Sequence, residues 1–127
     1  MITNRSPEAA TALASAIAQP LHVTTCAWSA LCEAGPYDLI VNATSAGVLG
    51  ASLELPRSLV GSHAFCYDLS YGAAAKSFIA WAEAAGAAQA VDGLGMLVEQ
   101  AADAFALWHG QRPQTGAVYQ QLRDSLP

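Results

Sequence analysis

Basic residues are scarce in this sequence. Its 127 residues include only five Lys and Arg against ten Asp and Glu, which gives a formal net charge of −5. Proteins that bind nucleic acid without sequence preference neutralise many phosphates with Lys and Arg, so this balance excludes nucleic acid as a partner of that kind. A small anionic ligand stays compatible with the composition, because one or two local donors suffice to hold it.

Cysteines and long apolar runs are also few. Cys26, Cys32 and Cys66 are an odd number at spacings that match no zinc or redox motif, so we expect no metal site and three small, buried, apolar side chains. No stretch reaches the roughly 18 to 20 apolar residues of a membrane-spanning helix, and the first three residues lack the features of a signal peptide. The expectation is therefore a cytoplasmic protein without a membrane partner.

The clearest helix start lies near the beginning of the chain. Ser6 is placed to cap, Pro7 takes the first helical position, and Glu8 favours the positive end of the helix. The helix is expected to run to about Gln19 and to stop at Pro20. Its apolar stripe consists of Ala10, Leu13, Ala14 and Ile17.

Strands and helices alternate through the rest of the chain. The segment YDLIVNATSAG contains a continuous β-rich run over residues 39–41, which is typical of a buried parallel strand. Other strands are predicted over residues 21–24, 64–69 and 88–91, and helical segments over residues 29–33, 76–85, 94–108 and 116–125. Two of these helices have predicted apolar stripes: Phe78, Trp81, Ala82 and Ala85 in one, and Leu97, Ala101, Ala104, Phe105 and Trp108 in the other. The order predicts one α/β domain with a Rossmann-like parallel sheet flanked by helices.

Polar residues follow the predicted strands, where ligands of such sheets bind. Asn4-Arg5-Ser6 combines an arginine with a helix start and suits an NADP 2′-phosphate, although a cap and a surface charge explain these residues equally well. The residues of NATSAG, from Asn42 to Gly47, either line a ligand or only form a turn. Gly93 and Gly95 do not match a phosphate-binding fingerprint and are consistent with a tight turn.

Four segments, read together and in order, resemble the carboxyl-terminal half of the shikimate dehydrogenase family: TNRS, DLIVNATSAG, CYDLSY and DGLGMLVEQAADAFALWHG. The last is the most specific, because neither packing nor turn formation requires Asp-Gly-Leu-Gly-Met followed by Gln100 and by Trp108-His109-Gly110. The resemblance implies an oxidoreductase that passes a hydride between NADP and shikimate, in the reversible reduction of 3-dehydroshikimate in aromatic amino-acid biosynthesis.

The resemblance also implies roles for individual residues. The residues expected to bind NADP are Asn4, Arg5, Ser6, Asn42, Ala43, Thr44, Ser45, Leu69 and Gly93. Among them, Arg5 is expected to select NADP over NAD, and Leu69 and Gly93 to lie beside the nicotinamide. The residues expected to bind shikimate or 3-dehydroshikimate are Tyr71 and Gln100.

One departure concerns the 2′-phosphate site. Where the family commonly has a second basic residue, three or four positions after the arginine, this chain has Pro7, Glu8, Ala9 and Ala10. A single cation therefore faces the phosphate, and a weaker preference for NADP is expected.

A second departure concerns the catalytic groups. The family's catalytic Lys and Asp, most of its shikimate contacts and its glycine-rich loop precede the matched region, and this sequence contains none of them. Since no group moves the hydroxyl proton, the chain alone is expected to be inactive. We interpret residues 1–127 as a fragment, a partial NADP-binding domain without the first strand, the glycine-rich loop and the amino-terminal substrate domain.

Such a fragment exposes a central edge of its sheet. An open edge predicts self-association or docking to an amino-terminal half. The closing helix over residues 116–125 is expected to leave Val118 and Leu122 facing water. Three interpretations stay open: a part of the enzyme, a noncatalytic nucleotide-binding or interaction module of the same fold, and an unrelated stand-alone α/β domain.

Overall fold

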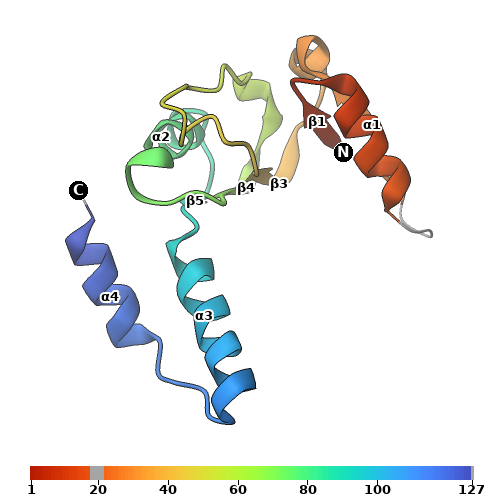
Figure 1. Cartoon of the computed structure of the whole chain (residues 1–127). Coiled ribbons are helices and arrows are strands. Elements are labelled where there is room, and N and C mark those ends of the chain that lie inside the picture. The colour runs from red at the N-terminus through yellow and green to blue at the C-terminus, as the bar shows by residue number, and fades with distance from the viewer. Residues whose placement is uncertain (18–21, 127) are drawn as a thin grey trace.

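A computed structural model describes residues 1–17 and 22–126 (Figure 1). The strands are β1 (Ile2–Asn4), β2 (Thr25–Ala27), β3 (Tyr37–Asn42), β4 (Val60–Asp68) and β5 (Gln89–Val91). The α-helices are α1 (Pro7–Ala16), α2 (Lys76–Ala84), α3 (Leu94–His109) and α4 (Gly116–Ser125), and short 3-10 helices are η1 (Trp28–Glu33), η2 (Arg57–Leu59) and η3 (Gly72–Ala74). The alternation of strands and helices confirms the predicted α/β class.

The strands are parallel, but within the described ranges they form two sheets. One sheet contains β1 and β2, and the other has the order β3-β4-β5. The predicted parallel sheet is thus divided into two parallel sheets in this part of the chain, because no described strand lies between β1 and β3 to pair with both. Among the described strands, each of these two has a hydrogen-bonded neighbour on one side only.

Helix α2 covers one face of the three-stranded sheet. Its buried Phe78 and Ala82 pack with the fully buried Cys66 of β4, and the indole N–H of Trp81 donates to the carbonyl of Leu55 at 2.8 Å. The predicted apolar stripe of this helix is confirmed at these positions. Burial raises the pKa of the Cys66 thiol, in keeping with a structural role.

The other two cysteines differ from expectation. Cys32 is exposed and Cys26 is half-buried, so the prediction of three buried cysteines is wrong for these two. Cys32 lies at the surface, near the end of the short η1 helix. The spacing of the cysteines in the sequence excludes a known metal or redox motif, but it does not determine whether a cysteine side chain is buried.

Helix α1 starts as predicted at Pro7, but its expected stripe is largely uncovered. Only Ala10 is buried, and Leu13 is 54% exposed. The described helix ends at Ala16, and the predicted end near Gln19 and Pro20 lies outside the described residues. The strand expected over 21–24, whose first position is also outside them, is found instead at Thr25–Ala27.

Helix α3 buries a different face from the one predicted. Its buried residues are Leu94, Val98 and Ala102, whereas Phe105 and Trp108 of the predicted stripe are 45% and 76% exposed. Because this helix is apolar on more than one side, its periodicity alone does not select the packed face. Gly110, with φ of +72°, ends the helix as expected after His109.

Helices α3 and α4 form a pair that projects from the sheet, with α4 returning along α3 (Figure 1). The bounds of α4 match the prediction, and Val118 and Leu122 are 48% and 38% exposed, as expected. No helix in the described ranges has the length and apolar content to cross a membrane.

Candidate functional site

A buried polar pair joins the carboxyl ends of β3 and β4. The Asn42 side-chain amide donates to Asp68 Oδ2 at 2.8 Å, and the two residues are 6% and 0% exposed. Asp68 Oδ1 accepts the Ser70 N–H at 2.7 Å, and the Leu69 N–H donates to the Asn42 carbonyl at 2.9 Å. A buried carboxylate is tolerated when its oxygens are hydrogen-bonded, as they are here. The pair therefore holds the loops after both strands in one arrangement.

The Asn42 side chain also forms the turn that follows β3. Its Oδ1 accepts the Thr44 N–H at 3.1 Å and the Thr44 hydroxyl at 2.8 Å. The hydrogen bonds between Asn42 and Thr44 are thus made within the turn, while Ala43 and Ser45 are exposed. The hydrogen bonds support the turn interpretation of this motif, and the interpretation that it lines a ligand stays a prediction.

Two glycines allow close approach between the strand-end loops. A Cβ on Gly47 would lie 1.8 Å from the carbonyl oxygen of Ala74, and a Cβ on Gly93 would lie 2.4 Å from that of Leu69. The Gly93 N–H donates to the Ser70 carbonyl at 2.8 Å, which fixes the start of α3 against the loop after β4. The structure thus brings together Leu69 and Gly93, the two residues expected beside a nicotinamide.

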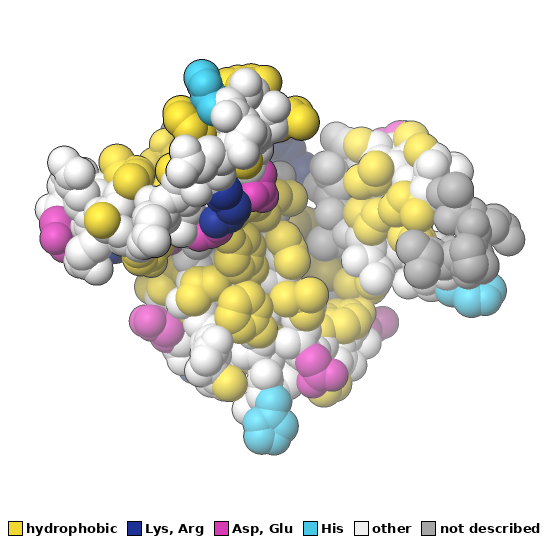
Figure 2. Space-filling model, turned by 90° about the horizontal axis from the view of Figure 1, so that it is seen from below, with side chains coloured by type: hydrophobic (Ala, Val, Ile, Leu, Met, Phe, Trp, Pro, Cys, Tyr) yellow, Lys and Arg dark blue, Asp and Glu magenta, His cyan; other side chains and the backbone are white. Residues whose placement is uncertain are grey.

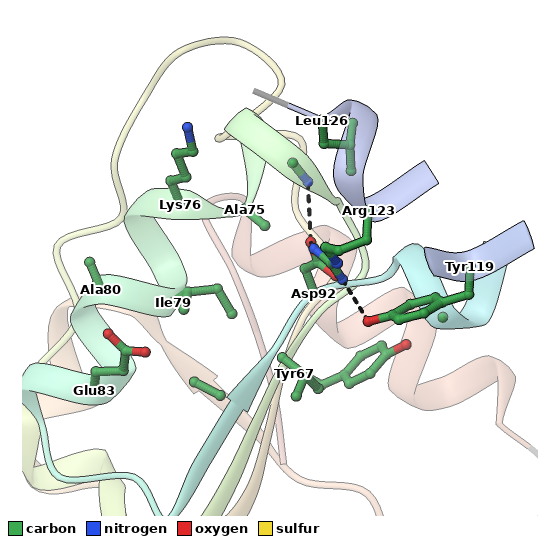
Figure 3. Close-up of a pocket in the computed structure, with 14 residues that line it drawn as sticks. Tyr67, Ala75, Lys76, Ile79, Ala80, Glu83, Asp92, Tyr119, Arg123 and Leu126 are labelled. Atoms are coloured by element: carbon green, nitrogen blue, oxygen red, sulfur yellow. Dashed lines mark hydrogen bonds and ion pairs between the residues drawn. The ribbon is translucent and has the colours of Figure 1, made fainter. Parts of the chain in front are cut away.

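Asp92 connects the start of α3 to α4 and to η3 (Figure 3). Its carboxylate accepts two bonds from the Arg123 guanidinium, at 2.6 and 2.8 Å, and the N–H groups of Gly72 and Leu94. Arg123 also donates to the Tyr119 hydroxyl at 3.0 Å. The bidentate pairing with Arg123 holds the pKa of Asp92 below its usual range and raises the pKa of Arg123.

A cavity of about 840 Å³ lies beside this ion pair. Figure 3 shows Lys76 and Glu83 of α2 on one side of it and Tyr67 and Tyr119 on the other. None of the predicted site residues lines this cavity. The Asp92–Arg123 ion pair lies at the wall of this cavity. It stabilises the loop between β5 and α3, because Asp92 directly precedes Gly93.

We expect Arg123→Ala to lower the free energy of unfolding by about 1 kcal/mol at neutral pH, since the Arg123 side chain is 36% exposed and its ion pair is partly screened. The lowered pKa of Asp92 means that the pair stabilises the fold above the ordinary carboxyl range and that this contribution is lost as the pH falls through the folded-state value. Urea unfolding at a series of acidic pH values should show the difference from wild type shrinking below about pH 4.

The matched control is Arg112→Ala. Arg112 forms exposed ion pairs with Glu99 and Asp103, for which a change near zero is expected. A wild-type advantage over Arg123→Ala that grows on acidification would contradict the assigned role of Asp92.

A groove of about 440 Å³ lies between the two sheets. Asn4 from the end of β1 and the three residues Asn42, Ala43 and Thr44 from the end of β3 all line it. The structure therefore brings together predicted nucleotide-binding residues from two separate strands. Ser45 is exposed beyond Thr44 and is not among the lining residues.

Arg5 and Ser6 are exposed at the start of α1, next to Asn4. Ser6 occupies the N-cap position, but its side chain makes no capping hydrogen bond to the described residues, so the predicted cap is wrong in this respect. Asn4 Oδ1 instead accepts the Ser6 N–H at 2.9 Å. The Ser6 hydroxyl and the Arg5 guanidinium are therefore both available at the surface.

Tyr71 and Gln100, the residues expected to bind substrate, are both exposed. Tyr71 is 43% exposed just before η3, and Gln100 lies on the surface of α3. No hydrogen bond within the described ranges links them, and neither lines the two cavities. Among residues 1–17 and 22–126, no group of three His, Cys, Asp or Glu is placed to hold a metal ion.

Sequence reasoning missed Asp68, Asp92 and Arg123 as site residues. Asp68 is the last residue of an apolar strand. An aspartate at that position is the feature of the sequence that could have indicated a buried carboxylate at the end of the strand. Asp92 lies in the segment DGLGM, but the sequence alone assigned it no role in a site. Its partner Arg123 lies 31 positions away, so no local pattern connects the two.

Comparison with known proteins gives a consistent family. The model of the Shikimate 5′-dehydrogenase C-terminal domain matches residues 93–123. The shikimate dehydrogenase (NADP(+)) of Stenotrophomonas maltophilia (strain R551-3) is 52% identical over 124 residues, which are 97% of this chain and 44% of that protein. The chain thus spans less than half the length of the curated relatives that it matches.

Solved structures agree in fold. An Ael1 enzyme from Pseudomonas putida is 41% identical with a TM-score of 0.80, covering 94% of this chain and 44% of that one. The shikimate 5-dehydrogenase of Thermus thermophilus in complex with shikimate is 31% identical, with a TM-score of 0.71 over 97% of this chain and 43% of that one. Its complex with NADP(H) and shikimate is 29% identical, with a TM-score of 0.68 over 98% and 45%.

Proposed function

Since this chain belongs to the shikimate dehydrogenase family and matches its carboxyl-terminal portion, we propose that it forms the NADP-binding side of an NADP-dependent shikimate dehydrogenase. The proposed reaction is the reversible reduction of 3-dehydroshikimate to shikimate. The proton transfers of this reaction are assigned to the part of the relatives that lies outside the match, because the family resemblance implies that the catalytic Lys and Asp lie there.

The observation that carries the proposal is the groove between the two sheets. Asn4 at the end of β1 and residues 42–44 at the end of β3 line it together. Ligands of parallel α/β sheets bind at the carboxyl ends of their strands, and these residues lie at two such ends. The arrangement supports a dinucleotide that runs across both.

The donors at the start of α1 fit the 2′-phosphate of NADP. Arg5 is exposed and has no ion pair within the described ranges, so its guanidinium is available to bind phosphate oxygens in a bidentate manner. The exposed Ser6 hydroxyl lies next to it, at the positive end of the helix. These groups are the proposed determinants of NADP selection.

The loops after β4 and β5 are proposed to face the nicotinamide and the substrate. NADP, when bound, supplies the hydride acceptor and donor. Leu69, 39% exposed, offers an apolar wall, and Gly93 carries no side chain that could block the ring. Tyr71 and Gln100 are proposed to hydrogen-bond the substrate through a hydroxyl and an amide, both of which are free at the surface.

Arg5→Ala tests the proposal through cofactor discrimination. Removing a charge-assisted bidentate contact is expected to weaken NADP binding by about 10- to 100-fold and to leave NAD binding unchanged, because NAD lacks the 2′-phosphate. The measurement is titration calorimetry with each nucleotide, on the chain combined with the amino-terminal part of the Stenotrophomonas maltophilia enzyme.

Arg57→Ala is the matched control, since Arg57 is an exposed arginine on η2 that does not line the groove. It is expected to leave the affinities for both nucleotides unchanged. An equal effect of Arg5→Ala on NADP and NAD would contradict the proposed role. Specific NADP binding without any turnover would favour a noncatalytic nucleotide-binding module.

A further inference from the structure

One carboxylate holds together the two segments that carry the proposed substrate-binding residues. Asp92 Oδ2 accepts the Gly72 N–H at 3.2 Å, and its Oδ1 accepts the Leu94 N–H at 3.3 Å. Gly72 directly follows Tyr71, and Leu94 is the first residue of α3, the helix that carries Gln100. The position of Tyr71 relative to α3 therefore depends on the Asp92 side chain.

Arg123 of α4 fixes the orientation of this carboxylate. Its two terminal guanidinium nitrogens donate to the two Asp92 oxygens, and one of them also donates to the Tyr119 hydroxyl at 3.0 Å (Figure 3). The guanidinium carbon lies 5.3 Å from the centre of the Tyr119 ring. Because a planar, bidentate pairing allows little rotation, the carboxylate oxygens stay directed at the Gly72 and Leu94 N–H groups.

The end of α4 also contacts the loop after β4 directly. A Cβ on Gly72 would lie 3.3 Å from Leu126 Cδ2, so the Leu126 side chain lies against this glycine. Gly72 has a φ of +59°, a conformation that other residues rarely adopt. The helix α4 therefore holds the residue after Tyr71 in two ways, through Leu126 and through the Arg123–Asp92 pair.

Tyr71 itself lies on an open surface and is 43% exposed. Figure 2 views the molecule from the side toward which α3 and α4 project, where hydrophobic side chains are gathered across the centre, beside the lobe that carries α1. Since packing does not enclose the Tyr71 side chain, the backbone on both sides of it determines where it lies. Before it, the Ser70 carbonyl accepts the Gly93 N–H at 2.8 Å. After it, the Gly72 N–H donates to Asp92.

We propose that Asp92, held by Arg123, is a positioning residue that places the Tyr71 hydroxyl relative to α3 for its hydrogen bond to the substrate. The inference rests on the proposed function, in which Tyr71 binds shikimate or 3-dehydroshikimate. Asp92 does not contact the substrate, because its side chain is 9% exposed and its oxygens already accept four hydrogen bonds from the protein. Helix α4 thus affects the affinity for the substrate through the backbone of the loop after β4.

An ion pair that only stabilised the fold would have a different kinetic effect. Its loss would lower the fraction of folded enzyme, which lowers the measured kcat and leaves the KM for shikimate unchanged. Loss of a positioning pair displaces the Tyr71 hydroxyl in every folded molecule. The KM for shikimate then rises and kcat stays the same, as expected for an interaction made equally in the ground state and the transition state.

The first test measures shikimate-dependent reduction of NADP by the chain combined with the amino-terminal part of the Stenotrophomonas maltophilia enzyme. Asp92→Asn keeps the shape of the side chain but loses one acceptor oxygen, and Arg123→Gln loses the bidentate pairing. Each is expected to raise the KM for shikimate about tenfold and to change kcat less than about twofold. Arg57→Gln, at the exposed arginine on η2, is expected to leave both values unchanged.

The second test shows whether the effect passes through Tyr71. Tyr71→Phe removes the hydroxyl and should itself raise the KM for shikimate about tenfold. In the Tyr71→Phe background, Asp92→Asn should raise the KM further by less than about twofold, because the group that it positions is already absent. Equal factors in the two backgrounds would overturn the inference.

The third test uses the chain alone and needs no turnover. Hydrogen exchange at single amides, followed by NMR, is compared between wild type and Arg123→Gln, and circular dichroism verifies that both are folded. Exchange at the Gly72 N–H is expected to be at least about tenfold faster in the variant. The Ser70 N–H, which donates to Asp68, provides the internal control and should exchange at the wild-type rate.

Three further outcomes would overturn the inference: unchanged exchange at Gly72, an unchanged KM for shikimate in the active variants, and a loss of kcat alone. Faster exchange at Gly72 together with an inactive wild-type combination has a different meaning. It would show that the pair holds the segment that carries Tyr71, and it would contradict the proposed function. The failure of the inference and the failure of the proposed function are therefore distinguishable.

Discussion

Asp68→Ala is expected to lower the free energy of unfolding by about 3 to 4 kcal/mol, because it removes a fully buried carboxylate from two donors. The Asn42 side-chain amide and the Ser70 N–H both lose their acceptor. A buried donor without a partner costs about 1 to 3 kcal/mol, and the cavity left by the carboxylate adds to the loss. Urea unfolding followed by circular dichroism measures the effect.

Two further variants test whether the lost hydrogen bonds of Asp68 cause this loss of stability. Asp68→Asn keeps one acceptor oxygen, which can serve only one of the two donors, so about half of the loss is expected. Asp124→Ala removes an exposed aspartate that accepts only from the Gln120 side chain among the described residues, and a change within about 0.5 kcal/mol is expected. An Asp68→Ala protein as stable as wild type would show that the pair with Asn42 does not hold the two loops.

Gly93→Ala is the second change with a large expected effect. The added Cβ would lie 2.4 Å from the Leu69 carbonyl oxygen and 2.8 Å from its carbon, and backbone atoms cannot move aside as a flexible side chain can. The start of α3 must therefore shift away from the loop after β4. We expect a loss of about 2 to 3 kcal/mol in the free energy of unfolding, measured in the same way.

Gly116→Ala provides the matched control for the same chemical change. Gly116 begins α4, no heavy atom lies within 4 Å of its added Cβ, and its backbone requires no positive φ. Alanine there is expected to stabilise the protein by up to about 1 kcal/mol, because it restricts the unfolded chain. Equal effects of the two substitutions would mean that Gly93 is not held against Leu69.

The parts of the fold that could be predicted are those with local signals. Helix α4 begins at the glycine at position 116, and β3 contains a continuous β-rich run; both elements were predicted to within a residue or two. The start of α1 at Pro7 was also predicted correctly. In each case the residues that define the element are close together in the sequence.

The parts that could not be predicted depend on partners distant in sequence. Asn42 and Asp68 are 26 positions apart, and Asp92 and Arg123 are 31 positions apart, so no periodicity indicates either pair. The packed face of α3 is likewise chosen by its neighbours and not by its own pattern. The candidate nucleotide residues were located through motifs, but the groove that joins Asn4 to Asn42 became visible only in the structure.

The most direct test of the account is shikimate-dependent reduction of NADP by the purified, folded chain, with and without the amino-terminal part of the Stenotrophomonas maltophilia enzyme. The account predicts no turnover from the chain alone and turnover when the two parts are combined. Turnover by the chain alone would show that these 127 residues contain the acid and base groups assigned to the other part. A stable, folded complex of the two parts without turnover would contradict the claim that this chain is the NADP side of a shikimate dehydrogenase.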